Sequence, residues 1–429
     1  MRVVVWGTGE TGIMTAHEMI RQGHEVRLVD EHMPERALEI PVKQMEIADL
    51  RWADLVIPSP GVPRSHPLFT YASRVLSEVE VASALLTGRI IAITGTNGKT
   101  TTTTLIYSIL HEAGFDVEIG GNISPPLISL VEKNSSWIVA EISSFQLEWI
   151  ESFKPFISVC MNITADHLDR YRDMEEYVYY KLKIFENQTG ENIAVINDGD
   201  PYLKGIDLRA RTAGFSLRPP STQDGAYLEG DRIRFQGSIS GAGPRIPDPR
   251  VIGGGVVEDM IASALVCRLL DVNTSVMERV FSAFKVIHHR FEHVATVNDI
   301  TFIDDSKATN VGALDKALSN LDGSVVLILG GKDKGGDFSQ IARTYRNKIK
   351  KAFVMGEAGP RITAEISPYV DTESARDMDD AVLGAYRIAR RGDTVLLSPG
   401  CASFDMYTSY AHRGDVFRQC VDSVLKTMK

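Results

Sequence analysis

The sequence predicts an α/β protein built on parallel sheets in three domains. Two stretches, Val3–Gly12 and Ile90–Thr101, run from an apolar strand through a glycine turn into a helix. Strands and helices alternate between and after them, which is the order of open parallel sheets. The 429 residues also exceed what one hydrophobic core usually organises. We therefore expect a Rossmann-like domain over residues 1–88, a central domain like the P-loop ATPases over 89–286, and a Rossmann-like domain over 287–429.

The composition excludes several classes of partner. Hydrophobic residues make up 44% of the chain, and the formal net charge of -10 disfavours nucleic acids and membrane surfaces. Met1-Arg2 leads directly into the first strand and no apolar run could span a bilayer, so we expect a cytoplasmic protein without a signal peptide. The four cysteines lack metal-binding spacing and are expected to be reduced thiols. They are Cys160, Cys267, Cys401 and Cys420.

The first segment contains a dinucleotide-type turn. Val3–Trp6 predicts a strand, Gly7–Gly12 has the pattern Gly-x-Gly-x-x-Gly, and Ile13–Arg21 predicts an amphipathic helix. The next strand, Val26–Val29, ends at Asp30, whose carboxylate could meet a ribose. NAD or FAD, another nucleotide, and a purely structural turn are the three alternatives. A second phosphate loop downstream needs its own nucleotide and therefore disfavours NAD.

Another loop in this segment follows the predicted strand that starts at Asp54. Ser59 lies in that loop, and it could contact a ligand or only shape the turn.

The central segment begins with a phosphate-binding loop. The strand Ile90–Thr94 is followed by Gly95-Thr96-Asn97-Gly98-Lys99-Thr100, and a helix is predicted over Thr100–Glu112. Backbone N–H groups of such a turn and the positive end of the helix bind phosphate oxygens. Lys99 is expected at the terminal phosphates of ATP, with the Thr100 hydroxyl on Mg²⁺. The loop is a shortened variant, because Ile93 occupies the position of the usual first glycine.

Polar residues follow two further strands of this segment. Glu141 ends the strand Trp137–Ala140, and His167 lies in the loop after the strand Phe156–Met161. Since ligands gather at the carboxyl ends of parallel strands, we expect Lys99, Glu141 and His167 in one crevice. Glu141 fits a Mg²⁺ ligand or a water-positioning acid, and His167 fits a second metal ligand, a substrate contact or a structural histidine. Lys181, in a predicted helix, is by default a surface lysine.

The last segment predicts a third α/β unit with polar loops after its strands. Asp304 and Asp305 could form a metal pair, or one could cap the following helix while the other meets a ribose. Lys307 and either Lys332 or Lys334 could bind a phosphate or a carboxylate, although isolated lysines are mostly solvated.

Taken together, these stretches resemble the Mur ligases over essentially the whole chain. Any one of them could occur by chance, but their order along one chain could not. The stretches that carry the resemblance are Gly95–Thr100, Gly121–Ile123, Glu141–Glu148, Asn162–Asp169, Lys181–Glu186, His289–Glu292, Asp305–Asn310 and Ser398–Ser403.

The resemblance implies an ATP-dependent ligase of peptidoglycan precursor synthesis. A carboxylate is a poor electrophile, so it would first receive a phosphoryl group, and the acyl phosphate would then meet the amine of an amino acid. The expected substrates are UDP-N-acetylmuramoyl-L-alanine and D-glutamate, and the expected state is a monomer. A different or additional amino acid, another Mur reaction, and less favourably an NAD(P)-dependent oxidoreductase are the alternatives.

The resemblance also assigns roles to residues. Those implied in catalysis are Lys99, Glu141, His167, Lys181 and Lys307. ATP would contact Gly95, Thr96, Asn97, Gly98, Lys99, Thr100, Thr101, Arg290 and Asp305. The UDP substrate would contact Gly9, Glu10, Thr11, Asp30, Ser59, Asn122 and His167. The amino acid would contact Thr309, Lys334, Ser403 and Tyr410. Two Mg²⁺ sites would use Thr100, Glu141, His167 and a carbamylated Lys181.

Overall fold

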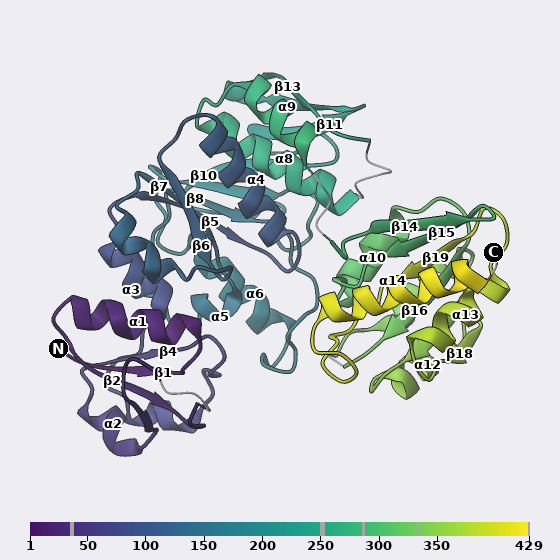
Figure 1. The fold of residues 1–429 in the computed structure, drawn as a ribbon. Coiled ribbons are helices and arrows are strands. Elements are labelled where there is room, and N and C mark those ends of the chain that lie inside the picture. Colours follow the sequence, from purple (N-terminus) through teal and green to yellow (C-terminus); the bar gives the residue numbers. More distant parts are fainter. Residues whose placement is uncertain (35–37, 249–253, 285–287, 333–334, 428–429) are drawn as a thin grey trace. The chain divides into compact units, whose positions relative to one another are not determined.

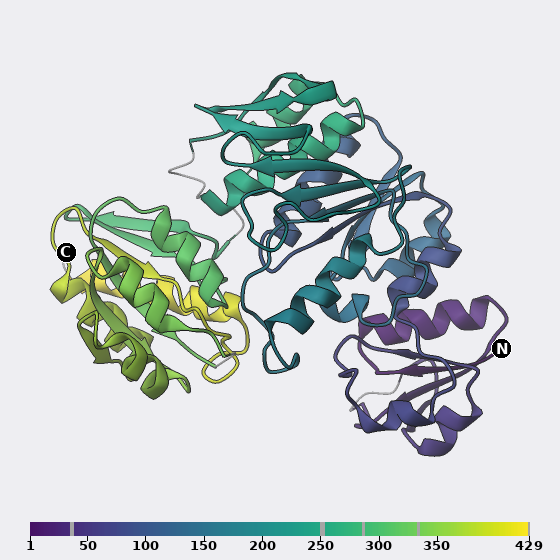
Figure 2. The same cartoon turned by 180° about the vertical axis from the view of Figure 1, so that it is seen from behind.

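The computed structural model describes residues 1–34, 38–248, 254–284, 288–332 and 335–427. These residues form three sheets, as the α/β prediction required (Figures 1 and 2). The chain divides into two compact units, and each is described by itself below. The first unit comprises Met1–Ile163, Glu175–Arg245 and Asp259–Phe281. The second comprises Thr164–Met174, Ile246–Glu258 and Ser282–Lys429. Within the described ranges, no helix combines the length and the apolar character that a membrane span requires.

The first sheet has four parallel strands in the order β3-β2-β1-β4. Its strands are β1 (Arg2–Trp6), β2 (Glu25–Asp30), β3 (Val42–Gln44) and β4 (Leu55–Pro58). Its helices are α1 (Glu10–Arg21), α2 (Ile47–Trp52), η1 (Pro67–Tyr71) and the following α3 (Glu78–Leu85). Buried side chains such as Val4, Trp6 and Val56 form the core beside α2.

The central sheet has nine strands in the order β13-β12-β11-β10-β9-β8-β5-β7-β6. The strands from β5 to β11 pair in parallel, whereas β12 and β13 extend the sheet as antiparallel hairpins. The strands are β5 (Arg89–Thr94), β6 (Val117–Gly121), β7 (Trp137–Glu141), β8 (Ile157–Cys160), β9 (Ile193–Asn197), β10 (Arg211–Ser216), β11 (Asp224–Glu229), β12 (Arg232–Gln236) and β13 (Gly241–Arg245).

Helices cover both faces of this sheet and connect its strands (Figure 1). They are α4 (Lys99–Glu112), η2 (Leu127–Lys133), α5 (Ser144–Leu147), α6 (Met174–Leu182), η3 (Lys183–Phe185), η4 (Gly237–Ile239), α8 (Gly254–Leu269) and α9 (Thr274–Ala283). The threonine-rich helix α4 forms despite its poor intrinsic propensity. Its buried face, including Leu105, Ile106 and Ile109, packs into the core and outweighs that preference.

The third sheet has six strands in the order β14-β15-β19-β16-β17-β18, parallel except for the β14–β15 hairpin. The strands are β14 (Glu292–Val297), β15 (Ile300–Asp304), β16 (Val325–Gly330), β17 (Ile349–Met355), β18 (Thr372–Ser374) and β19 (Thr394–Leu397). One core joins the sheet to α10 (Val311–Ser319), α11 (Phe338–Tyr345) and α12 (Gly359–Ile366). A second core joins it to α13 (Met378–Ile388) and α14 (Tyr410–Thr427).

One prediction about this third sheet is wrong. Neither Asp304 nor Asp305 caps α10, because Asn310 does so by accepting the Ala313 N–H over 2.9 Å. Asp304 instead accepts the Ser306 N–H over 3.0 Å. The predicted domain boundaries at residues 88 and 286 stay predictions.

Candidate active site

The phosphate loop joins β5 to α4 in the first unit. Gly95 and Gly98 have φ angles of +149° and +85°, which side-chain-bearing residues rarely adopt. A Cβ on Gly98 would lie 2.2 Å from Oδ1 of Asp259, so a larger residue here would have to displace that side chain of α8. The first N–H groups of an α-helix have no acceptor within the helix itself, and α4 begins directly after the loop. The loop therefore offers the backbone donors that phosphate oxygens need.

Two lysine side chains converge on the start of this loop. Lys99 Nζ donates to the carbonyls of Gly95 and Thr96 over 2.9 and 3.0 Å. Lys181 Nζ, on α6, donates to the same Gly95 carbonyl over 2.9 Å, although 82 residues separate the two lysines (181 minus 99). Lys181 is only 2% exposed and its ammonium lies 4.7 Å from the Tyr177 ring centroid. The default interpretation of Lys181 as a surface lysine is therefore wrong.

Asn162 holds the middle of the loop. Its Oδ1 accepts the Asn97 N–H over 2.9 Å and its Nδ2 donates to the Asn97 carbonyl over 3.1 Å. Its own carbonyl accepts the Thr96 N–H over 2.8 Å. The Thr96 hydroxyl lies 3.1 Å from the hydroxyl of Tyr177. Thr101 is fully buried, and its hydroxyl has no hydrogen-bond partner among the described residues, so its predicted contact with ATP stays a prediction.

Glu141 ends the strand next to the loop. In the sheet, Ile93 of β5 pairs with Glu141 of β7, so both strands end at the same edge. Glu141 is 2% exposed, and its Oε1 accepts from Asn122 Nδ2 over 2.8 Å. Its Oε2 is buried with no hydrogen-bond partner among the described residues. A carboxylate oxygen left over in this way fits a hard cation such as Mg²⁺.

The dinucleotide-type turn lies between β1 and α1. A Cβ on Gly7 would lie 2.2 Å from Ser59 Oγ, and one on Gly12 would lie 1.9 Å from the Gly7 carbonyl oxygen. These approaches explain the glycine spacing. Ser59 Oγ is buried against the turn with no partner in the described part of the chain, which supports the turn-shaping alternative for this residue.

Asp30 holds this turn from the end of β2. Its Oδ2 accepts the N–H and the hydroxyl of Thr8, both over 2.8 Å, and its Oδ1 accepts the His32 N–H over 3.1 Å. Burial acts to raise the pKa of Asp30, but these hydrogen bonds from His32 and Thr8 hold it below its usual value. Both oxygens of the carboxylate predicted to meet the substrate are thus already used within the protein.

In the second unit, Asp305 is a buried carboxyl group. Its Oδ1 accepts the Phe291 N–H over 3.1 Å and its Oδ2 accepts the Ser398 hydroxyl over 3.0 Å. Burial raises the pKa of Asp305 to about 7, against these hydrogen bonds and the charge of Arg290. Arg290 Nε is buried without a hydrogen-bond partner among the described residues.

Residues predicted for the amino-acid pocket lie around a second buried cation. Lys307 Nζ donates to the hydroxyl of Tyr410 over 3.0 Å. Arg413, 1% exposed, donates from Nη1 to the Cys401 carbonyl over 3.1 Å and from Nε to Ser306 Oγ over 3.0 Å. It thereby ties the loop of Ser403 to the loop that carries Lys307. The Thr309 N–H donates to the Lys307 carbonyl over 2.8 Å, whereas Lys334 lies outside the described residues.

His167 belongs to the second unit. Its φ is +56°, its N–H donates to Asp166 Oδ1 over 2.9 Å, and its Nε2 lies 3.7 Å from Asp166 Oδ2. Asn310, the cap of α10, donates from Nδ2 to the same Asp166 Oδ2 over 3.1 Å. Because Lys99 and Glu141 belong to the first unit, the crevice predicted for the three residues stays a prediction.

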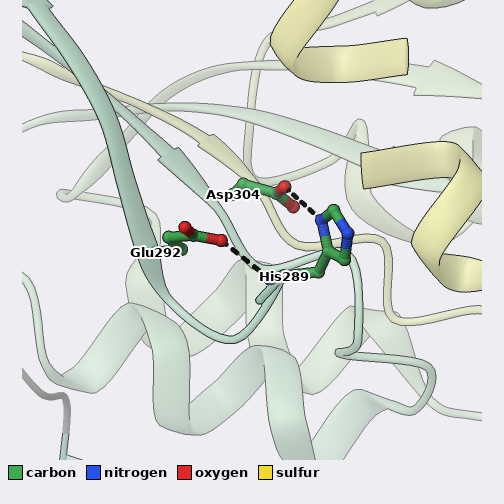
Figure 3. Close-up of side chains that lie close together, drawn as sticks. All are labelled: His289, Glu292 and Asp304. Atoms are coloured by element: carbon green, nitrogen blue, oxygen red, sulfur yellow. Dashed lines mark hydrogen bonds and ion pairs between the residues drawn. The ribbon is translucent and has the colours of Figure 1, made fainter. Parts of the chain in front are cut away.

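His289, Glu292 and Asp304 form a cluster that contains the ligand types of a metal site (Figure 3). Asp304 directly precedes Asp305 in the sequence. His289 Nδ1 lies 2.7 Å from Asp304 Oδ2, and the His289 N–H donates to Glu292 Oε2 over 3.0 Å. Arg418 contacts both carboxylates, with its Nε 3.5 Å from Asp304. Since the guanidinium supplies the positive charge, the cluster is an ion-pair network of the protein itself.

Three residues that hold the candidate site were given no role by the sequence. Asn162 directly follows a predicted strand end, and that position was the available signal. Tyr177 and Arg413 act across 81 and 107 residues of chain, and no local pattern marks such contacts.

The sequence matches the Mur ligase middle domain over residues 93–240 and the Mur ligase glutamate ligase domain over residues 289–401. UDP-N-acetylmuramoylalanine–D-glutamate ligase of Trichlorobacter lovleyi is 38% identical over 440 residues, covering 97% of each chain. The enzyme of that name from Geobacter metallireducens is 38% identical over 443 residues, covering 98% of this chain and 97% of the relative.

Solved structures share the fold at lower identity. The pseudomurein peptide ligase type C from Methanothermus fervidus has a TM-score of 0.64 at 17% identity, covering 99% of both chains. The MurF ligase of Thermotoga maritima in complex with ADP has a TM-score of 0.61 at 15% identity, covering 100% of this chain and 95% of that one. The three-domain α/β fold and the phosphate loop define an ATP-dependent ligase. The chain belongs to the Mur ligase family.

Proposed function

We infer that this chain joins D-glutamate to UDP-N-acetylmuramoyl-L-alanine, with ATP, in peptidoglycan precursor synthesis. The observation that carries the inference is the convergence of Lys99 and Lys181 on the Gly95 carbonyl. This carbonyl lies at the edge of the sheet where β7 ends with Glu141. The relatives at 38% identity, matched over 97–98% of this chain, carry that activity in their names. The choice of D-glutamate rests on these relatives.

The chemistry follows from the poor reactivity of a carboxylate. Transfer of the terminal phosphoryl group of ATP to the substrate's carboxylate would give an acyl phosphate, which the amine of D-glutamate attacks, releasing phosphate. Lys99 and the N–H groups of the loop offset the negative charge of the transferring group. Asn162 holds the loop in shape by accepting from the N–H of Asn97 and donating to its carbonyl.

The residues present fit a divalent cation. The hydroxyl of Thr100 would hold one Mg²⁺ at the phosphates, and Glu141 would hold a second Mg²⁺ through its unpartnered Oε2. Bound Mg²⁺ would neutralise charge on the phosphates during transfer. His167 and a carbamylated Lys181 would complete the second Mg²⁺ site, at Glu141. The burial of Lys181 beside the loop supports this role.

The remaining assignments are proposals of the same kind. The turn of Gly9, Glu10 and Thr11 would bind the UDP end of the substrate, and Arg290 and Asp305 would contact the nucleotide. Lys307, Thr309, Lys334, Ser403 and Tyr410 would form the amino-acid pocket. The ammonium group of Lys307 donates to the hydroxyl of Tyr410. This positive charge supports a pocket for a dicarboxylic amino acid. A monomer with domains at 1–88, 89–286 and 287–429 completes the proposal.

The experiment is a phosphate-release assay with ATP, Mg²⁺ and UDP-N-acetylmuramoyl-L-alanine against a panel of D- and L-amino acids. Release that requires both the UDP substrate and D-glutamate, with an amide product of matching mass, is the expected result. Release with a different amino acid would correct the specificity. No release with any of them, from a folded chain that binds ATP, would overturn the proposal.

A further inference from the structure

A short segment connects the dinucleotide-type turn to Glu141 in the first unit. Asn122, after β6, donates from Nδ2 to Glu141 Oε1 over 2.8 Å, and its N–H donates to the Glu141 carbonyl over 2.7 Å. Two residues later, Ser124 Oγ donates to Oε1 of Glu10 over 2.7 Å. Glu10 is the first residue of α1 and lies inside the Gly-x-Gly-x-x-Gly turn. Three consecutive residues therefore connect the turn to the metal-binding candidate Glu141.

The carboxylate of Glu10 stands where the proposed function places an anionic diphosphate. The positive end of α1 stabilises a negative charge at this position, but a second anion beside it would be repelled. The hydroxyl of Ser124 fixes one carboxylate oxygen and so determines where the side chain points. Asp30, the other carboxylate at this turn, already uses its oxygens for Thr8 and His32.

The other end of α1 offers a matched contact. Arg21, its last residue, has its Nε 3.1 Å from Oε1 of Glu132, which lies in η2 of the same connecting segment. Both pairs join α1 to the segment that follows β6. Only the Glu10–Ser124 pair lies next to the glycine turn and next to Asn122.

We propose that the Glu10–Ser124 hydrogen bond positions the UDP substrate for the ligase reaction. By fixing the glycine turn relative to Asn122 and Glu141, the bond sets where the substrate's acid lies when its diphosphate end is seated. The inference rests on the proposed function. Glu10 and Ser124 are positioning residues, because their effect on the reacting carboxylate passes through the turn and through Asn122.

The test compares steady-state constants of five variants. Ser124→Ala removes the bond, and the KM for UDP-N-acetylmuramoyl-L-alanine rises about three- to tenfold, with kcat and the KM for ATP within about twofold of wild type. Glu10→Gln keeps an acceptor for Ser124 and removes the charge that repels the diphosphate, so this KM falls below the wild-type value. Glu10→Ala alone raises the same KM, and Glu10→Ala combined with Ser124→Ala raises it no more than the larger of the two single changes, because both remove one bond. Glu132→Gln, the matched control at the far end of α1, leaves all constants unchanged.

Thermal midpoints that agree across the variants show that each one folds. An unchanged KM in Ser124→Ala, additive effects in the double variant, or an equal rise in Glu132→Gln would overturn the inference while wild type remains active. A folded wild type without ligase activity would instead overturn the proposed function, and the inference with it.

Discussion

The first unit contains two strand–glycine turn–helix junctions that differ in charge. The turn before α1 has an acidic first helical residue, Glu10, and is held by the carboxylate of Asp30. The turn before α4 begins its helix with Lys99 and receives a second ammonium group from Lys181. The same strand–turn–helix geometry thus occurs once with two carboxylates, Glu10 and Asp30, and once with two ammonium groups, Lys99 and Lys181. Under the proposed function, the difference predicts that the first turn binds the diphosphate end of the substrate and that only the second supports phosphoryl transfer.

The largest expected effect is the loss of the loop lysine. Lys99→Met removes the cation that offsets charge on the transferring phosphoryl group, so kcat should fall by about 10²–10³-fold or more. Phosphate release at saturating substrates measures it. Lys154→Met, at an exposed lysine outside both turns, is the matched control and should keep wild-type kcat. A Lys99→Met enzyme with kcat near wild type would remove the distinction between the two turns.

The next largest effect tests whether the second turn works with Mg²⁺ held by Glu141. Glu141→Gln keeps an acceptor for Asn122 but loses the charge that fits Mg²⁺. The Mg²⁺ concentration for half-maximal activity should rise at least about tenfold, and kcat should fall about 10²-fold. Titration of activity against Mg²⁺ gives the first value, and Mn²⁺ binding by electron paramagnetic resonance with ATP gives an independent one. An unchanged Mg²⁺ requirement would argue against Glu141 as a ligand.

The first turn should respond in binding alone. Asp30→Asn weakens the hydrogen bonds to the N–H and hydroxyl of Thr8 that shape the turn. The KM for the UDP substrate should rise about tenfold, equivalent to about 1.4 kcal/mol, while kcat and the KM for ATP stay within about twofold. A fall in kcat as large as in Glu141→Gln would mean that both turns serve the chemical step.

Sequence reasoning could find both turns because their signals are local. Glycine spacing, β-branched strands and the position of Lys99 act within about a dozen residues, so the loop and its helix were predicted at the correct place. Asp30 also matched its pattern, but the structure uses its oxygens for Thr8 and His32. Patterns predict which side chain follows a strand, and they leave open what that side chain already contacts.

Long-range contacts escaped prediction for the same reason. The burial of Lys181 against Gly95 was visible only once β5 and α6 were placed together. Capping of α10 was assigned to the wrong residue because Asp304 is drawn to His289, leaving Asn310 as the cap. Both cases depend on packing between segments far apart in the chain.

The last prediction concerns stability instead of turnover, at the contact between α3 and the segment that connects the two turns. Glu78, the first residue of α3, is buried and accepts the Ile128 N–H over 2.6 Å, at the connecting segment, while its Oε2 has no partner among the described residues. Burial raises the pKa of Glu78 to about 7, against that one hydrogen bond. A carboxyl group with a raised pKa in the folded protein stabilises it fully below its unfolded pKa of 4.5, and this contribution is lost as pH rises through about 7.

Glu78→Gln removes this titration. Its thermal midpoint relative to wild type should rise between pH 5 and pH 7.5, by the equivalent of no more than about 3 kcal/mol. Glu80→Gln is the matched control on the same helix, because Glu80 accepts the N–H groups of Ser152 and Phe153 over 2.9 and 2.8 Å. That change should lower the midpoint, because it weakens those hydrogen bonds. A difference between Glu78→Gln and wild type that does not change with pH would show that Glu78 titrates alike in the folded and unfolded chain. Burial of Glu78 at its contact with Ile128 would then add no pH-dependent term to the free energy of unfolding.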